Sequence, residues 1–108
     1  MTNNQKAADL LDAAADLIAK PGAWTQGALA RTAKGNRCDP TSRRAVCWCA
    51  LGALDRFYDA DSMPGSAILQ LNKMTGFNIP GWQDDPARNQ GDVVRLLRRA
   101  AKKLRSAP

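Results

Sequence analysis

Histidine and glutamate are both missing from this sequence, and each absence removes a class of site. Histidine is the commonest general base and the commonest metal ligand in proteins, so the usual serine and cysteine triads are excluded with it. All ten acidic residues are aspartate. Because the acidic partner in a capping box is usually glutamate, we expect no helix to begin with one.

Other catalytic and metal-binding patterns are also missing. The chain has no glycine-rich phosphate loop, and adjacent carboxylates occur only at Asp84–Asp85. Cys38, Cys47 and Cys49 are fewer than the four ligands of a structural zinc site. Cys38 follows Arg37, a cation that could activate its thiol, but we interpret it as an unreactive loop cysteine. We therefore predict no catalytic residue, no cofactor and no metal ion, in a protein that is not an enzyme.

Long hydrophobic runs are missing as well. The longest uncharged apolar stretch has ten residues, whereas a helix that crosses a bilayer needs ~20. The first six residues contain no hydrophobic signal region, and an odd number of cysteines cannot all pair within the chain. We expect no membrane association and a reduced cytoplasm, that of a bacterium or an infected host cell. With 108 residues, of which 44% are hydrophobic, the chain is expected to be one domain, residues 1–108.

The apolar stretch from Ala45 to Leu54 is expected to organise the fold. Wound as a helix, it is apolar on every side, which is typical of a fully buried helix. Asp39–Pro40 resembles a helix start, and Pro64–Gly65 prevents continuation, so we predict a central helix from about Pro40 to Tyr58. Gly52, in its middle, indicates that a neighbouring backbone approaches closely.

Three further helices are predicted around this central helix, which gives an all-α, compact four-helix domain, with or without one small β-hairpin. The first carries an apolar arc opposite Asp9, Asp12 and Asp16 and ends before Pro21. The second runs from Ser66 to about Thr75 with Ile68, Leu69, Leu71 and Met74 buried, and the last from Gln90 to about Arg105. Residues 77–89 are predicted to be a loop, in which Trp82 covers the core.

The segment 24–39 allows two interpretations. Residues 25–32 fit a short helix, or residues 28–33 pair with residues 37–39 across Lys34–Gly35–Asn36, a turn in which Gly-Asn supplies positive φ. We favour the hairpin. The helical alternative invites comparison with a helix-turn-helix DNA reader, but the next predicted helix is apolar and could not present polar side chains to bases.

Basic residues concentrate in two places on this chain of net charge +6. The last predicted helix separates its apolar arc from a basic ridge, which comprises Arg95, Arg98, Arg99, Lys102, Lys103 and Arg105. A second candidate binding cluster precedes the apolar stretch and comprises Arg31, Lys34, Arg37, Arg43 and Arg44. Such surfaces are either solvated faces or binding sites for nucleic acid or an acidic protein surface. The ridge carries no aromatic residue, which disfavours binding of single strands by base stacking.

Several segments together resemble a family of small bacterial and phage proteins known only as a domain of unknown function. These segments are Trp48–Leu54 with the sequence Trp-Cys-Ala-Leu-Gly-Ala-Leu, Gln26–Ala30, Trp82 and Asp92–Leu97. The resemblance extends from about Leu10 to Leu104. Where the family places Asn-Asp after the tryptophan, this chain has Gln83–Asp84. The resemblance supports the fold and implies no activity.

From these patterns we predict a small non-enzymatic binding protein, of the phage or bacterial accessory type. It would regulate or inhibit a larger host machine through the basic face of its C-terminal helix. Direct binding of nucleic acid is the alternative. The sequence indicates neither the partner's identity nor the oligomeric state.

Overall fold

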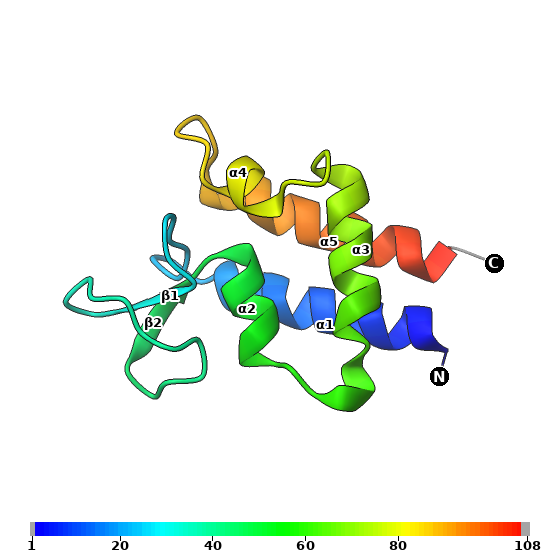
Figure 1. Ribbon diagram of the computed structural model, residues 1–108, viewed down its shortest axis with the longest axis horizontal. Coiled ribbons are helices and arrows are strands. Elements are labelled where there is room, and N and C mark those ends of the chain that lie inside the picture. Colours follow the sequence, from blue (N-terminus) through cyan, green and yellow to red (C-terminus); the bar gives the residue numbers. More distant parts are fainter. Residues whose placement is uncertain (1, 107–108) are drawn as a thin grey trace.

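Helix α1 (Asn3–Ile18) lies at the centre of the fold and contacts α2, α3 and α5 (Figure 1). The structure is a computed structural model and describes residues 2–106. The Thr2 hydroxyl accepts a hydrogen bond from the Gln5 N–H at 3.1 Å, and Gln5 Oε1 accepts one from the Thr2 N–H at 2.8 Å. This pair is a capping box with glutamine in the place of glutamate, so the expectation that capping boxes would be absent was wrong.

Helices α5 (Gln90–Ser106) and α3 (Pro64–Met74) complete the helical layer against α1. Both predicted helices are confirmed, although α3 begins at Pro64 and one of its predicted core residues, Leu69, is 49% exposed. Helix α5 runs antiparallel to α1, so that α1 begins and α5 ends at the same end of the molecule (Figure 1). We call this the helical end.

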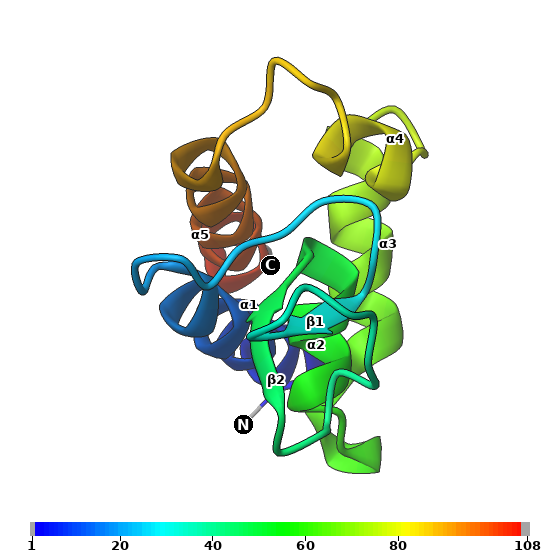
Figure 2. The same ribbon diagram turned by 90° about the vertical axis from the view of Figure 1, so that its left-hand side faces the viewer.

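The opposite end is a small antiparallel hairpin, formed by β1 (Ala30–Thr32), β2 (Ala45–Trp48) and the loop between them (Figure 2). Ala30 pairs with Trp48 and Arg31 with Cys47, and the register then shifts so that Thr32 pairs with Ala45. The predicted turn at 34–36 is present, with Gly35 at φ 86°, and Arg31 forms a bridge with Arg37. The hairpin interpretation is therefore confirmed, but the main partner of β1 is β2 and not residues 37–39.

The apolar stretch Ala45–Leu54 is not one helix, and the predicted central helix Pro40–Tyr58 was wrong. Its first four residues form β2, and only Ala50–Arg56 are helical, as α2. Asp39 does not cap a helix: its Oδ1 accepts hydrogen bonds from the N–H and hydroxyl of Thr41 at 2.8 and 2.6 Å, which closes a turn. A short apolar run suits a strand as well as a helix, and here it provides one of each.

The segment 77–89, predicted to be a loop, instead contains a short helix, α4 (Ile79–Gln83), which is capped by the Asn78 side chain. A single 3-10 turn, η1 (Ala60–Ser62), joins α2 to α3. Within residues 2–106 there are thus five α-helices, one more than predicted. One buried cluster includes side chains from α1, the hairpin and all the other α-helices. None of the helices in the described range is both long and apolar enough to cross a membrane.

Candidate functional site

The basic ridge of α5 is divided by its contacts with α1. Arg98 reaches Asp16 at 2.6 Å and Asp12 at 3.2 Å, and Arg105 reaches Asp12 at 2.6 Å and Asp9 at 2.9 Å. These hydrogen bonds raise the pKa of both guanidinium groups. The largest contribution comes from the bond to Asp16 for Arg98 and from the bond to Asp12 for Arg105. Two of the six cations therefore join α5 to the acidic face of α1.

The other four cations of the ridge extend from the outer side of α5. Arg95 forms an ion pair with Asp92 at 2.6 Å, one turn earlier on the same helix. The pKa of Asp92 is lowered most by a hydrogen bond from the Asn89 backbone N–H and next by this contact with Arg95. Arg99, Lys102 and Lys103 line a shallow hollow of about 310 Å³ and have no ion-pair partner among residues 2–106.

At the hairpin, three cations from the second predicted cluster surround one groove. Lys34 lies in the turn after β1, and Arg43 and Arg44 precede β2, so that pairing of the two strands brings them together. The groove has a volume of about 460 Å³ and is also lined by Thr32, Ala33, Asn36 and Val46. All three basic residues are exposed and lack an ion-pair partner in the described part of the chain. We call Lys34, Arg43 and Arg44 the hairpin cluster.

The two remaining candidates in this segment lie elsewhere. Arg31 is used for folding, because its guanidinium donates hydrogen bonds to the Thr25 hydroxyl at 3.1 Å and to the carbonyls of Gln26 and Gly35 at 3.2 and 3.1 Å. Arg37 lines a different, smaller cavity of about 260 Å³. Of the five basic residues that the sequence grouped here, the structure brings Lys34, Arg43 and Arg44 to one groove, whereas Arg31 and the exposed Arg37 line other parts of the surface.

Gln83, which the sequence analysis did not single out as a functional residue, holds the hairpin end in place. Its side chain is 2% exposed, and its Oε1 accepts hydrogen bonds from the Trp24 indole at 2.6 Å and from the Ala50 N–H at 3.1 Å. Its Nε2 donates to the Thr25 carbonyl and to Asp84 Oδ1, at 3.1 and 3.0 Å. The same Asp84 oxygen accepts from the Gly27 N–H at 3.0 Å. This network links the start of the hairpin segment to α2 and α4.

Gly52 makes the second connection between the hairpin and the helices. A Cβ at this position would lie 1.8 Å from the Leu29 carbonyl oxygen, which also accepts a hydrogen bond from the Cys49 N–H at 3.1 Å. The close backbone approach that the sequence predicted at Gly52 is confirmed, although the neighbour is the strand segment and not another helix. Two of the segments that carried the family resemblance, Gln26–Ala30 and Trp48–Leu54, therefore meet at this junction.

The cysteines and carboxylates of the described residues do not come together as a metal centre. No group of three or more His, Cys, Asp or Glu residues within 2–106 could hold a metal ion. Burial raises the pKa of Cys49, which keeps its thiol protonated, and its sulfur accepts a hydrogen bond from the Gly52 N–H at 3.3 Å. Trp82, predicted to cover the core, is partly buried against it, with the Arg88 guanidinium 3.7 Å from its ring centroid.

Comparison with known proteins gives a family but no activity. Neither a curated protein nor a solved structure matches this chain. One family model matches residues 2–103, that of a family of unknown function, DUF6197. The match includes the hairpin and all five helices except the last residues of α5. The chain therefore belongs to the DUF6197 family of unknown function.

Proposed function

We propose that this protein is a non-enzymatic binding protein whose hairpin cluster binds a negatively charged surface of a larger partner. The observation that carries the proposal is the convergence of Lys34, Arg43 and Arg44 around one groove. Side chains that protrude into solvent without an intramolecular counterion attract an anionic partner over a Debye length of ~10 Å and can form ion pairs with it. Asp39 is the one acidic residue between β1 and β2.

The C-terminal ridge is a weaker candidate than the sequence indicated. Arg98 and Arg105 already have aspartate partners on α1, and Arg95 has one on its own helix. Arg99, Lys102 and Lys103 remain at the helical end around a hollow of about 310 Å³, smaller than the hairpin groove of about 460 Å³. We therefore assign the ridge a secondary role in binding.

An acidic protein surface is the partner we favour, in keeping with a phage or bacterial accessory protein that regulates or inhibits a larger host machine. Duplex nucleic acid is the second candidate, because a two-stranded antiparallel ribbon fits the major groove of DNA. None of the residues that line the hairpin groove is aromatic, which argues against single strands held by base stacking. We also propose a cytoplasmic location, since a reduced compartment suits three free cysteines.

The test compares two charge-matched triple variants by fluorescence anisotropy, using a poly-aspartate peptide and a short DNA duplex as probes. Lys34→Gln with Arg43→Gln and Arg44→Gln is expected to lower affinity by about tenfold or more, which is ~1.4 kcal/mol. Arg95→Gln with Arg99→Gln and Lys102→Gln removes the same charge and is expected to have a much smaller effect. Circular dichroism checks that both variants remain folded.

The two probes separate the two partner classes. Tighter binding of the duplex than of poly-aspartate, with a salt slope that shrinks by roughly 0.9 for each lost phosphate contact, would favour nucleic acid. A larger loss from the C-terminal triple than from the hairpin triple would move the site back to α5. If neither probe distinguishes the variants from the parent protein, the hairpin cluster is a solvated surface and the proposal is wrong.

A further inference from the structure

A groove runs along one face of α1, next to the ion pairs that join this helix to the basic ridge of α5. Two hollows lie along this face and share Ala13 and Phe57 among their lining residues. The first has a volume of about 410 Å³ and extends along α1 from Lys6 to Ala13. The second has a volume of about 270 Å³ and extends from Ala13 to Lys20. Together they form one groove, which Phe57 divides in its middle.

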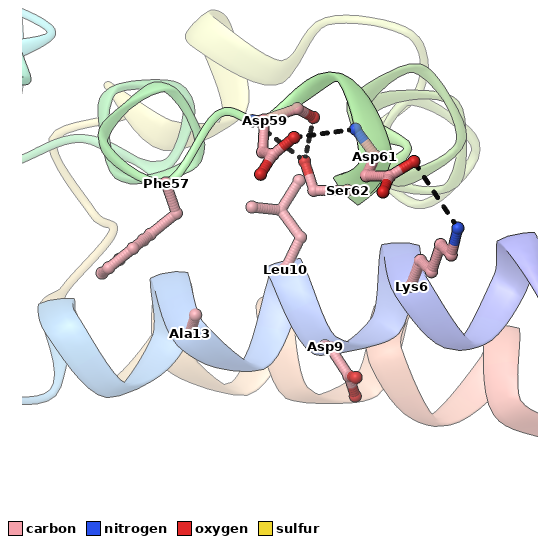
Figure 3. Close-up of a pocket in the computed structure, with 8 residues that line it drawn as sticks. All are labelled: Lys6, Asp9, Leu10, Ala13, Phe57, Asp59, Asp61 and Ser62. Atoms are coloured by element: carbon pink, nitrogen blue, oxygen red, sulfur yellow. Dashed lines mark hydrogen bonds and ion pairs between the residues drawn. The ribbon is translucent and has the colours of Figure 1, made fainter. Parts of the chain in front are cut away.

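The floor of the groove is apolar and the dividing residue is aromatic. Figure 3 shows the first hollow, with Leu10 and Ala13 rising from α1 and the Phe57 side chain extending from the end of α2 towards α1. Phe57 is 40% exposed, and Tyr58 next to it is 64% exposed. Large aromatic side chains that lie partly in solvent beside a hollow are typical of the centres of protein–protein interfaces.

The groove is lined by four aspartates and two lysines, Lys6 and Lys20, so acidic residues are in excess there on a protein that is basic as a whole. Asp59 and Asp61 stand above the first hollow in Figure 3. Asp59 has no ion-pair partner among residues 2–106, and the 91% exposed Asp61 side chain approaches Lys6 only at 3.8 Å. Asp9 points away from the hollow and binds Arg105 on α5. Asp16, at the second hollow, is held by Arg98 but is still 71% exposed.

The length of the groove defines what fits into it. Lys6 and Ala13 lie seven residues apart on α1, so the first hollow spans ~10 Å at a rise of 1.5 Å per residue. The second hollow continues from Ala13 past the end of α1 at Ile18 to Lys20. A second helix placed along α1 would present side chains to the two hollows from positions seven residues apart. An extended peptide would cover the same distance with about three residues and would place the next side chain on the opposite face.

We propose that this groove binds an amphipathic helix of a partner protein, which places two apolar residues seven positions apart on either side of Phe57. The partner helix carries lysine or arginine at the flanking positions, facing Asp59 and Asp61. Charge complementarity selects this occupant, because the protein has a net charge of +6 and attracts a basic helix only where acidic residues are in local excess. The inference goes beyond the proposed function, since it concerns a partner of opposite charge at another surface.

The probe is a fluorescein-labelled designed helical peptide with two leucines seven residues apart and lysines at the flanking positions. A matched peptide has glutamates in place of the lysines. The lysine peptide is expected to bind the intact protein about tenfold or more tightly than the glutamate peptide. Equal binding of the two peptides, or tighter binding of the glutamate peptide, would overturn the proposal.

Two variants locate the binding site. Phe57→Ala is expected to weaken binding of the lysine peptide by about tenfold or more, as for a residue at an interface centre. The matched control is Phe77→Ala, which removes a 70% exposed phenylalanine from the loop after α3 and should leave affinity unchanged. Because Phe57→Ala could also disturb folding, Asp59→Asn with Asp61→Asn provides an independent test. This double variant retains side-chain oxygens that can accept hydrogen bonds at the η1 turn. It should weaken binding of the lysine peptide several-fold.

Other occupants of the groove give different results. Self-association of the protein that Phe57→Ala abolishes would identify a second copy as the occupant and would overturn the proposal. Binding of the intact protein to anionic lipid vesicles that depends on Phe57 would identify a membrane surface and would do the same. Loss of lysine-peptide binding in Phe57→Ala and in the aspartate variant, but not in Phe77→Ala, supports the partner helix.

Discussion

At the helical end of the molecule, Arg98 and Arg105 reach the aspartates of α1, whereas at the hairpin end Lys34, Arg43 and Arg44 surround an open groove. Both sets are basic and both lie near the surface. They differ in what faces them, because α5 packs against an acidic helix face and the hairpin packs against no acidic element that the structure describes. Charge that a neighbouring element neutralises serves folding, and charge without such a neighbour remains available to a partner.

The two ends also differ in how they are held. The helical end depends on the apolar faces of α1, α3 and α5, which bury leucine, valine and alanine side chains over several turns. The hairpin has only three and four residues in its strands, and the contacts that join it to the helices include Gly52 against Leu29 and the hydrogen bond between Gln83 and Trp24. Substitutions at these two contacts should therefore act on the hairpin end first.

The largest effect is expected from Gly52→Ala. The added methyl group would lie 1.8 Å from the Leu29 carbonyl oxygen, and this atom belongs to the backbone and cannot rotate away. The strand segment must shift and weaken the hydrogen bond from the Cys49 N–H, so we expect a loss of about 3 kcal/mol or more in the free energy of unfolding. Urea denaturation measures this difference directly.

Gly65→Ala is the matched control for Gly52→Ala. Gly65 lies in the first turn of α3, and a Cβ built there meets nothing within 4 Å. Alanine favours a helix by up to about 1 kcal/mol relative to glycine, so this variant should be as stable as the parent or slightly more so. If Gly52→Ala unfolds at the same urea concentration as Gly65→Ala, the hairpin does not approach α2 as closely as described.

A smaller loss is expected from Gln83→Leu, which preserves volume and removes the hydrogen-bonding groups. The Trp24 indole N–H and the buried Ala50 N–H then lose their acceptor. Leaving such groups unsatisfied costs about 1–3 kcal/mol, and we expect a total near 2 kcal/mol. Hydrogen exchange should show faster exchange of the β1 and β2 amides, with the α1 and α5 amides less affected.

Gln70→Leu makes the same chemical change on α3, where the glutamine side chain forms no hydrogen bond within the described part of the chain. It should leave the hairpin amides unchanged. Uniform acceleration of exchange in α1, α5 and the hairpin by Gln83→Leu would show that the hairpin is not a separate unit, and the contrast between the two ends would then be lost.

The difference between the ends also explains which parts of the fold could be predicted from the sequence. Helices α1, α3 and α5 are long enough for their 3.6-residue periodicity to show, and each was predicted close to its observed range. The segment Ala45–Leu54 has no periodicity, because every residue in it is apolar or small. Its division into β2 and α2 at Cys49 depends on pairing with β1, a contact that sequence spacing alone does not reveal.

The positions of the basic residues on the surface were predictable in part. Counting charges identified both the ridge and the cluster before β2, but it treated all cations of a group as equivalent. Asp9, Asp12 and Asp16 form a stripe on α1 with spacings of three and four residues, and Arg98 and Arg105 lie seven residues apart on α5. The sequence did not show that α1 and α5 pack antiparallel, which brings these aspartates and arginines together. Gln83 was noted only as a difference from the family pattern, since one glutamine in a predicted loop does not indicate a buried network.

The smallest effect is expected from a comparison of two pairs of cations within the ridge itself. Arg98→Gln with Arg105→Gln removes both bridges to α1 and leaves Asp9, Asp12 and Asp16 close together without counterions. Exposed ion pairs contribute only ~0.2–1 kcal/mol each, and Arg98 and Arg105 are 44% and 42% exposed, so we expect a loss of about 1 kcal/mol.

Arg99→Gln with Lys102→Gln removes equal charge, but these residues have no partner within 2–106, so stability should change by no more than about 0.5 kcal/mol. Thermal unfolding at low and high salt measures both, and the difference between the pairs should shrink as salt screens the bridges. Equal stabilities at low salt would mean that Arg98 and Arg105 are as available to a partner as Arg99 and Lys102, and the whole ridge would again compete with the hairpin cluster as the binding surface.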